Sequence, residues 1–327
     1  MLQAHLVYAG LYLFNLVVAY PVYLVFLFTI IKFRREPIFS STFYYLVLVC
    51  GVFDLLYTFH YYLILFPAFL QIPAINQFYL SLGWQEATFN FYLFIFLRCA
   101  QVILVLLISL NRFTCLVCPL RHDQIWSRKV ARGATIAAIS IAGLLLVPAA
   151  VNGCYMTYFP DEDDPGKLSQ RDVNDACLPA FVVYLTFPTF IVLLLMVLYP
   201  IMLVSNHLYK SPAATTDEQR QKRRTNVSLA VAGLILSCSL ALTITLYWLF
   251  FIVSQFEGSL FLYMCMVCDS LFCLSNPVVL LMFGQKIRPF FWRTCKGLLC
   301  RSTKQPSNNV PPTGQNQIGE DIVIEDA

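Results

Sequence analysis

The chain has 327 residues, of which 59% are hydrophobic and only 12% are charged. This balance excludes an ordinary soluble domain and is typical of a polytopic membrane protein. The net charge of +4 is small, and we expect no nucleic-acid partner.

Seven apolar stretches are each long enough to cross the roughly 30 Å hydrocarbon core of a bilayer as a helix. In chain order they are Leu6–Ile31, Thr42–Phe66, Glu86–Leu110, Gly133–Asn152, Pro179–His207, Asn226–Ser254 and Leu260–Gly284. We therefore predict an all-α membrane protein, a seven-transmembrane helix bundle, with boundaries good to a few residues.

The segment after the last span, residues 285–300, mixes large apolar side chains with basic ones. This pattern is typical of a short amphipathic helix on the inner membrane surface, where cations meet anionic lipid. Within it, Cys295 and Cys300 are candidates for lipidation, and unmodified thiols fit equally well. Residues 301–327 are polar with an acidic end, so we expect a disordered cytoplasmic tail.

Basic residues predict the orientation of the bundle. Nineteen lysines and arginines lie on the side of the first, third and fifth loops and the tail, against Lys167 and Arg171 on the opposite side. The amino terminus is therefore expected outside the cell and the carboxyl terminus in the cytoplasm, in a multi-pass protein of the plasma membrane.

A charged residue deep in a span is costly, so Arg98 in the third span and Asp269 in the seventh are functional candidates. Arg98 lies 14 residues before Arg112 and Asp269 lies 15 residues before Gly284, which is about 21 and 22 Å along each axis. Equal depth predicts a buried ion pair that borders a cavity, where an anionic or polar ligand competes for Arg98. A purely structural pair, or Arg98 hydrated alone, fits the sequence equally well.

Asp54 in the second span and Asn276-Pro277 in the seventh predict a second polar group, on the interior of the bundle. An acid, an amide and a proline-broken backbone have alternative hydrogen-bond arrangements, which suits a two-state switch. Helix association alone is the alternative.

The loop between the fourth and fifth spans, residues 153–178, is acidic and is flanked by Cys154 and Cys177. If this loop is extracellular, a disulfide between the two cysteines is plausible. Most of the other cysteines fall inside apolar spans, and no metal-binding spacing is supported, so we expect no metal and no other cofactor.

Glu86, near the outer mouth of the third span, is a candidate ligand contact, and a surface role is as good an interpretation. Four aromatic residues are candidates for lining an apolar pocket, although packing or lipid contact explains each of them as well: Tyr61, Tyr62, Phe94 and Tyr247. The four histidines do not cluster, which argues against an intramembrane enzyme.

The order of three motifs resembles the G-protein-coupled receptors, and more specifically the nematode serpentine chemoreceptors of classes gamma and v. The motifs are Gly51–Tyr57, Asn111-Arg112-Phe113 followed by Pro119, and Ser275-Asn276-Pro277 followed by Ile287-Arg288. The resemblance implies a small-molecule ligand and a heterotrimeric G protein as partners, with a homo- or heterodimer left open, and it leaves a sensory cilium open as the location.

The resemblance also implies roles for individual residues. Arg112 becomes the hinge of activation and part of the G-protein docking surface, Asp54 the acid of the second span, and Asn276 with Pro277 the switch of the seventh. Asn111 stands where the wider rhodopsin-like pattern has an acid beside the arginine. No cysteine lies near Ala87 at the outer end of the third span, which favours the pairing of Cys154 with Cys177.

Two other functions remain as alternatives. A ligand-gated channel of the insect odorant-receptor kind also has seven spans, but with its amino terminus inside the cell, against the charge count. A transporter is disfavoured by the absence of a sequence repeat.

Overall fold

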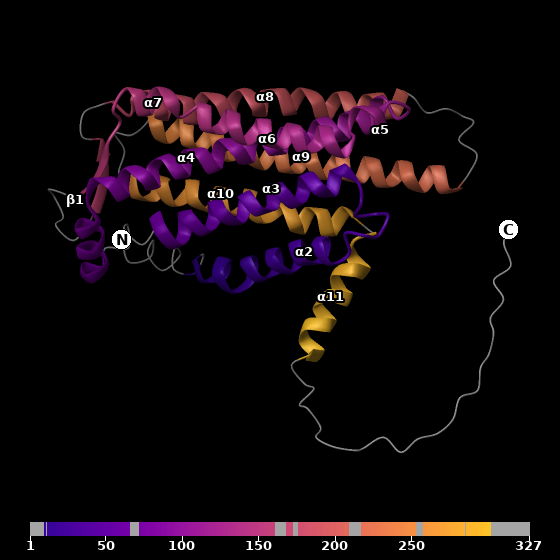
Figure 1. The fold of residues 1–327 in the computed structure, drawn as a ribbon, viewed down its shortest axis with the longest axis horizontal. Helices are drawn as coiled ribbons and strands as arrows, with labels where there is room; N and C mark the ends of the chain where they lie inside the picture. The colour runs from indigo at the N-terminus through magenta and orange to yellow at the C-terminus, as the bar shows by residue number, and fades with distance from the viewer. Residues whose placement is uncertain are drawn as a thin grey trace, which may run out of the picture.

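The computed structural model describes residue 10 and residues 12–65, 72–160, 168–172, 176–208, 217–252, 258–284 and 286–301. The expected cytoplasmic tail from residue 302 and the first nine residues lie outside this part. Figure 1 shows the described helices running side by side as one elongated bundle, with the strands at one end.

The bundle is built from helices that follow the predicted spans. Its first element is a π-helical turn η1 (Asn15–Ala19) that continues into α2 (Tyr20–Lys32), and α3 (Thr42–Phe59) continues into a second π-helical turn η2 (His60–Leu65). The remaining elements are α4 (Pro73–Val117), α5 (His122–Ile125), α6 (Arg128–Leu144), α7 (Val147–Val151), α8 (Leu178–Leu208), α9 (Asp217–Ile252), α10 (Gly258–Phe283) and α11 (Arg288–Arg301).

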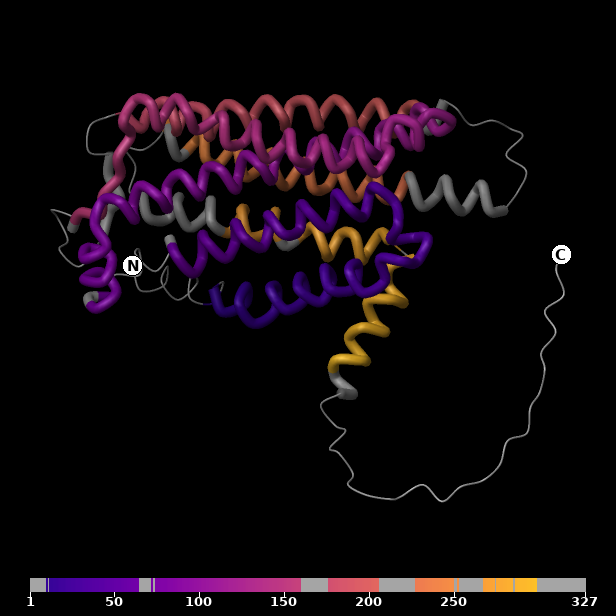
Figure 2. Tube along the Cα trace, viewed as in Figure 1, coloured from indigo at the N-terminus to yellow at the C-terminus, as the bar shows by residue number. Residues whose placement is uncertain are grey.

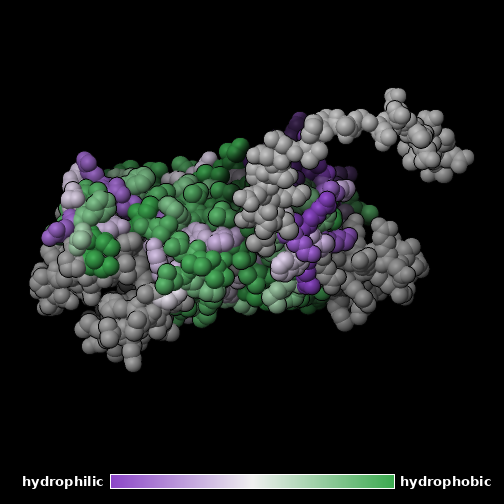
Figure 3. Space-filling model, turned by 90° about the horizontal axis from the view of Figure 1, so that it is seen from below, coloured by the Kyte–Doolittle hydropathy of each residue, from purple (hydrophilic) through white to green (hydrophobic). Residues whose placement is uncertain are grey.

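Six helical segments in the described residues are long and apolar enough to cross a membrane. They are Tyr12–Lys32, Thr42–Ile64, Ala74–Val117, Arg128–Val151, Leu178–Ser205 and Val227–Leu249. Helix α10, with 26 residues, packs against α9, α3 and α2 as the seventh helix of the bundle. In Figure 3, a broad hydrophobic surface covers the middle of the bundle and hydrophilic residues gather toward its ends, as expected for a protein that spans a bilayer.

Helix α4, with 45 residues, extends beyond the predicted third span Glu86–Leu110 at both ends. Pro73 occupies its first turn, where a missing backbone N–H costs nothing. Gly83 interrupts the helix with a φ of 75°, a conformation that residues with a Cβ rarely adopt. The helix ends at Val117, since Pro119 disfavours helical geometry at Cys118.

Helix α4 is the central element, and it packs against α3, α6, α8 and α9. Its middle is almost fully buried, with Cys99, Ala100, Val102 and Leu104 at 0% exposure. Helix α6 begins after Ser127, whose hydroxyl accepts a hydrogen bond from the backbone N–H of Val130.

The acidic loop between the fourth and fifth spans contains a structure that the sequence did not predict. Strands β1 (Met156–Pro160) and β2 (Leu168–Asp172) form an antiparallel hairpin with Met156 opposite Asp172. The acidic residues between the strands lie outside the described residues. We call the end of the bundle that carries this hairpin the hairpin end, and the opposite end, where α5 and α11 lie, the α11 end; Figure 2 shows both ends along the tube.

Helix α11 is the predicted amphipathic helix, and it packs against α2. Its Phe290 ring lies 4.9 Å from the ring of Phe33 and 5.3 Å from that of Phe39, centroid to centroid. Trp292 is 61% exposed on the helix surface. These contacts hold the first turn of α11 against the bundle. Figure 1 shows the rest of the helix leaving the bundle at an angle.

Candidate functional site

Arg98 and Asp269 form the ion pair that their equal depth predicted. Arg98 Nη2 lies 2.8 Å from Asp269 Oδ1, and both side chains are 1% exposed. The guanidinium carbon also lies 5.4 Å from the ring centroid of Tyr57 and 5.2 Å from that of Phe272. A buried charge needs this kind of compensation, because the pair has lost its contact with water.

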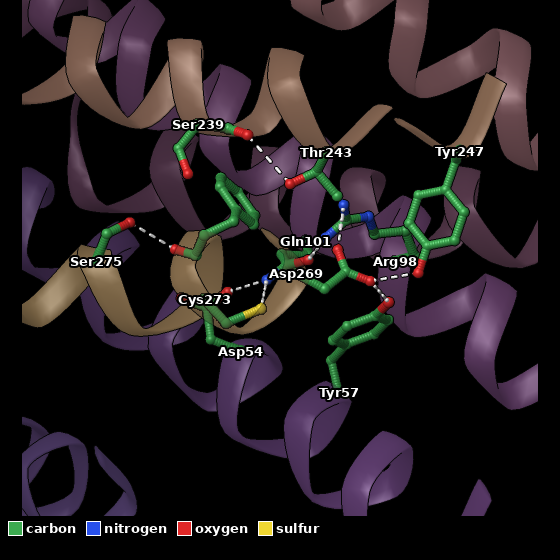
Figure 4. Close-up of polar contacts among 11 residues, drawn as sticks. Asp54, Tyr57, Arg98, Gln101, Ser239, Thr243, Tyr247, Asp269, Cys273 and Ser275 are labelled. Atoms are coloured by element: carbon green, nitrogen blue, oxygen red, sulfur yellow. Dashed lines mark hydrogen bonds and ion pairs between the residues drawn. The ribbon is translucent and has the colours of Figure 1, made fainter. Parts of the chain in front are cut away.

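Two tyrosine hydroxyls complete the environment of the acid, as Figure 4 shows. Tyr57 of α3 donates to Asp269 Oδ2 at 2.8 Å, and Tyr247 of α9 donates to the same oxygen at 2.6 Å. The pair therefore connects α4 and α10 to α3 and α9. Neither hydroxyl contact was predicted, although Tyr247 was a candidate pocket residue.

Gln101 extends the polar contacts toward the α11 end of the bundle. Its carbonyl oxygen accepts a hydrogen bond from Arg98 Nη1 at 3.0 Å, and its Nε2 donates to Asp54 Oδ1 at 2.5 Å. The same Nε2 lies 3.2 Å from Cys273 Sγ. Gln101 is fully buried, so the ion pair and Asp54 belong to one connected set of side chains.

Asp54 is held by neutral donors rather than by a cation. Its Oδ2 accepts a hydrogen bond from Asn276 Nδ2 at 2.6 Å and another from the Tyr23 hydroxyl, while its Oδ1 accepts from Gln101. The predicted contact between Asp54 and Asn276 is therefore present, next to Pro277 inside α10. We call the set Tyr57, Arg98, Gln101, Tyr247, Asp269, Asp54, Tyr23 and Asn276 the polar chain.

Arg112 does not pair with a carboxylate among the described residues. Its guanidinium carbon lies 3.3 Å from the ring centroid of Phe43 on α3, and its buried Nε has no hydrogen-bond partner. The neighbouring Asn111 is buried and donates to the Thr42 hydroxyl at 3.3 Å. An aromatic face, in place of an acid, therefore contacts the arginine.

A cavity connects Arg112 with the polar chain. It has a volume of about 40 Å³, and its lining includes Asp54, Asn276, Arg112 and Tyr199. This volume has room for a few water molecules. The Tyr199 hydroxyl lies 2.8 Å from Ser109 Oγ, which joins α8 to α4 beside the cavity.

Glu86 belongs to a different group of side chains, at the hairpin end. Its Oε1 accepts a hydrogen bond from Asn90 Nδ2 at 3.2 Å, and Asn90 Oδ1 lies 3.2 Å from His60 Nε2. His60 and Asn90 are buried, whereas Glu86 is half-buried. The described contacts do not bring Glu86 to Arg98, although both were candidates for one ligand site.

An aromatic layer adjoins the ion pair. We give this name to Tyr61, Phe94, Tyr184 and Tyr247, whose successive ring centroids are 5.6, 5.2 and 5.7 Å apart. Two contacts join this layer to the ion pair and its partners: Tyr247 donates to Asp269, and the Phe94 ring lies 5.4 Å from that of Tyr57, centroid to centroid.

Cys154 and Cys177 are joined by a disulfide that ties the start of the hairpin to the start of α8. The Tyr92 hydroxyl donates to the Cys154 carbonyl at 3.2 Å. The Thr88 hydroxyl bonds both the carbonyl and the N–H of Met156, at 3.2 and 3.0 Å. The hairpin is thus fixed to α4 as well as to α8.

Helix α11 carries the two lipidation candidates. The Cys295 thiol is partly buried, and this burial raises its pKa. The side chain of Cys300 lies outside the described residues. Within the described part of the chain, no group of three or more His, Cys, Asp or Glu residues is placed to hold a metal ion.

A family model described as serpentine type 7TM GPCR chemoreceptor Srv matches residues 12–297. The chain belongs to this family. The match runs from the helical turn before η1 into α11, so it includes the whole bundle and the polar chain. It confirms the resemblance to the nematode serpentine chemoreceptors and gives Srv where the sequence left two classes open.

Membership in the Srv family makes the protein a multi-pass membrane protein of a chemosensory receptor family. In general, such receptors take small-molecule ligands and G proteins as partners. No curated protein matches the chain.

Proposed function

We propose that this Srv receptor binds an external small molecule at its hairpin end and signals to a heterotrimeric G protein at its α11 end. The observation that carries the proposal is the polar chain, which runs without interruption from Tyr247 and Asp269 to Asn276. A ligand acts by binding one arrangement of the bundle better than another. In the proposal, the coupled hydrogen bonds between five helices, α2, α3, α4, α9 and α10, rearrange between two such states.

We propose that the ligand binds around the aromatic layer. Tyr247 belongs to this layer and also donates to Asp269, so a ligand that moves its ring alters the ion pair. A polar or anionic group on the ligand then competes with Asp269 for Arg98. Glu86, half-buried nearer the hairpin, contacts the ligand on its way in.

The signalling site of the proposal comprises Arg112, Asn111, Asp54, Asn276 and Pro277. A rearrangement at Asn276 reaches Arg112 through the cavity that both residues line. Arg112 has no charged partner to release among the described residues, so its displacement from Phe43 is the step that exposes it to the G protein.

The orientation of the proposal rests on charge. Nineteen of the 22 lysines and arginines belong to the predicted first, third and fifth loops, the inner end of the third span and the tail. By the positive-inside rule we assign the α11 end to the cytoplasm and the hairpin end to the exterior. The disulfide at the hairpin end agrees with an oxidising exterior. We place the receptor in the plasma membrane, with the sensory cilium as a candidate location, and assign it no catalytic role.

The experiment is a ligand screen in cells with a calcium or cAMP readout, paired with Arg112→Ala and with epitope tags at both termini. We expect ligands that trigger a signal in the wild type and none in Arg112→Ala at equal surface level, with the amino-terminal tag accessible outside. An amino-terminal tag found only in the cytosol would contradict the proposal and favour a channel of the odorant-receptor kind. A ligand-independent substrate flux would favour a transporter.

A further inference from the structure

We propose that Gln101 is the positioning residue that couples the Arg98–Asp269 pair to the Asp54–Asn276 pair, through the fixed direction of its side-chain amide. The role of Gln101 in signalling rests on the proposed function. The coupling of the two pairs by hydrogen bonds does not depend on it. The amide is fully buried on α4, three residues after Arg98 and on the same face of the helix.

The two ends of the amide have opposite chemistry, and each meets the partner it requires. Arg98 only donates hydrogen bonds, and it meets the carbonyl oxygen of Gln101 at 3.0 Å. The carboxylate of Asp54 only accepts, and it meets Nε2 at 2.5 Å. Turning the amide over would place a donor against Arg98 and an acceptor against Asp54. One orientation is therefore strongly favoured while both partners are in place.

The direction of the amide makes the two pairs interdependent. When Arg98 leaves the Gln101 carbonyl, the amide loses the contact that fixes its direction, and Asp54 loses a firmly oriented donor. Asp54 then depends on Tyr23 and Asn276, which both donate to its other oxygen. A change at the ion pair therefore alters the hydrogen bond between Asp54 and Asn276, the residue next to the proline of α10.

Three related side chains each fail at least one of these demands. Glutamate would accept from Arg98 but would face Asp54 with a second carboxylate. Methionine would fill the space and make neither hydrogen bond. Asparagine has the same amide on a side chain shorter by one methylene, so it cannot span the distance between Arg98 and Asp54.

The geometry gives a paired test by exchange of donor and acceptor. In Gln101→Glu, the new carboxylate repels Asp54. In Asp54→Asn, the new NH2 group meets a donor in either orientation of the amide, Nε2 of Gln101 in one and Nδ2 of Asn276 in the other. In the double variant, the introduced asparagine donates to the introduced glutamate through the nitrogen that replaces Oδ1 of Asp54. Its carbonyl oxygen replaces Oδ2 and still accepts from Tyr23 and Asn276.

We expect each single variant to lower the melting temperature of the purified protein by several degrees and the double variant to recover most of the loss. If a single variant yields no folded protein, the recovery of folded protein in the double variant is the readout. A double variant no better than the worse single variant would overturn the proposal.

A second measurement tests the coupling itself. The effects of Asp269→Asn and Asn276→Ala on the melting temperature are expected to be non-additive in the wild-type background and additive in a Gln101→Met background. Asn90→Leu, which removes another buried amide of α4, is the matched control and is expected to leave the non-additivity in place. Additive effects in the wild type, or unchanged non-additivity in Gln101→Met, would overturn the coupling.

These measurements need neither ligand nor G protein, so the two proposals fail separately. A wild-type receptor that activates no G protein would count against the proposed function and leave the coupling by Gln101 intact. A receptor that signals normally while the exchange variants show no recovery would count against Gln101 alone.

Discussion

Gly233→Ala is predicted to destabilise the bundle because α9 and α8 approach each other closely at this position. A Cβ added to Gly233 would overlap the Tyr199 hydroxyl oxygen and Cζ, and it would lie 2.5 Å from Cε1 of the same ring. No carbon atom tolerates such distances, so the ring of Tyr199 has to move. Tyr199 is 2% exposed, and its hydroxyl bonds Ser109 at 2.8 Å.

The cost of this substitution follows from two contributions. Forcing an extra methyl into a packed interior costs about 1–3 kcal/mol. Losing the hydrogen bond to Ser109 adds about 0.5–1.5 kcal/mol. The sum, on the order of 3 kcal/mol, corresponds to a drop in melting temperature on the order of 5–10 °C for the purified receptor in detergent.

Two further variants make the test specific. Gly133→Ala in α6 is the matched control, since nothing lies within 4 Å of the added Cβ. Helix propensity then makes it neutral or slightly stabilising. In a Tyr199→Leu background, Gly233→Ala is expected to cost little. A Gly233→Ala protein that melts with the wild type, or that loses as much in the Tyr199→Leu background, would refute the packing argument.

Three further substitutions test the site and the hairpin. Asp269→Asn leaves Arg98 buried without a counter-charge and is expected to lower the free energy of unfolding by about 3–5 kcal/mol. The double variant Arg98→Met with Asp269→Leu should restore most of the lost free energy of unfolding. A denaturation curve of Asp269→Asn that matches the wild type would argue against a buried ion pair. Phe43→Leu removes the ring over Arg112, so basal G-protein signalling should rise several-fold while Phe43→Tyr stays at the wild-type level; equal basal signals in both variants would disprove this restraint. Cys154→Ser opens the disulfide and should cost about 2–5 kcal/mol in a thermal melt, an effect that would be missing if the bond contributed nothing.

Charge at depth was the most informative sequence signal. Arg98 and Asp269 lie at matching distances from the ends of their spans, and a cation in hydrocarbon needs a partner, so the ion pair was predictable. The contact of Asp54 with Asn276 was predictable because both are polar residues inside apolar spans and were expected on the interior of the bundle. The role of each pair in ligand binding or signalling stays a prediction.

The residues that connect the pairs were missed because they carry no charge. Gln101 had one usable signal, a polar side chain three residues after Arg98 on the same helical face. Tyr23 and Tyr57 had none, since an aromatic residue in an apolar span is ordinary. The contact of Arg112 with Phe43 depends on how α3 packs against α4, which a single sequence does not reveal.

Two parts of the fold were misjudged for physical reasons. The helical segment of α4 before Gly83 was not predicted, and α4 continues past the predicted Leu110 to Val117; the part after Gly83 begins close to the predicted Glu86. The hairpin was read as a loop because its strands are short. Contacts from Thr88 and Tyr92 of α4 stabilise it, and such tertiary contacts do not appear in local sequence patterns.

The most direct test of the receptor account is nucleotide exchange on a purified heterotrimeric G protein by the receptor reconstituted in lipid, with and without a ligand found in the cell screen. We predict that the ligand accelerates exchange with the wild type and has no effect with Arg112→Ala, although both bind the ligand. Ligand-driven ion or solute flux through the same vesicles, without any acceleration of exchange, would contradict the account.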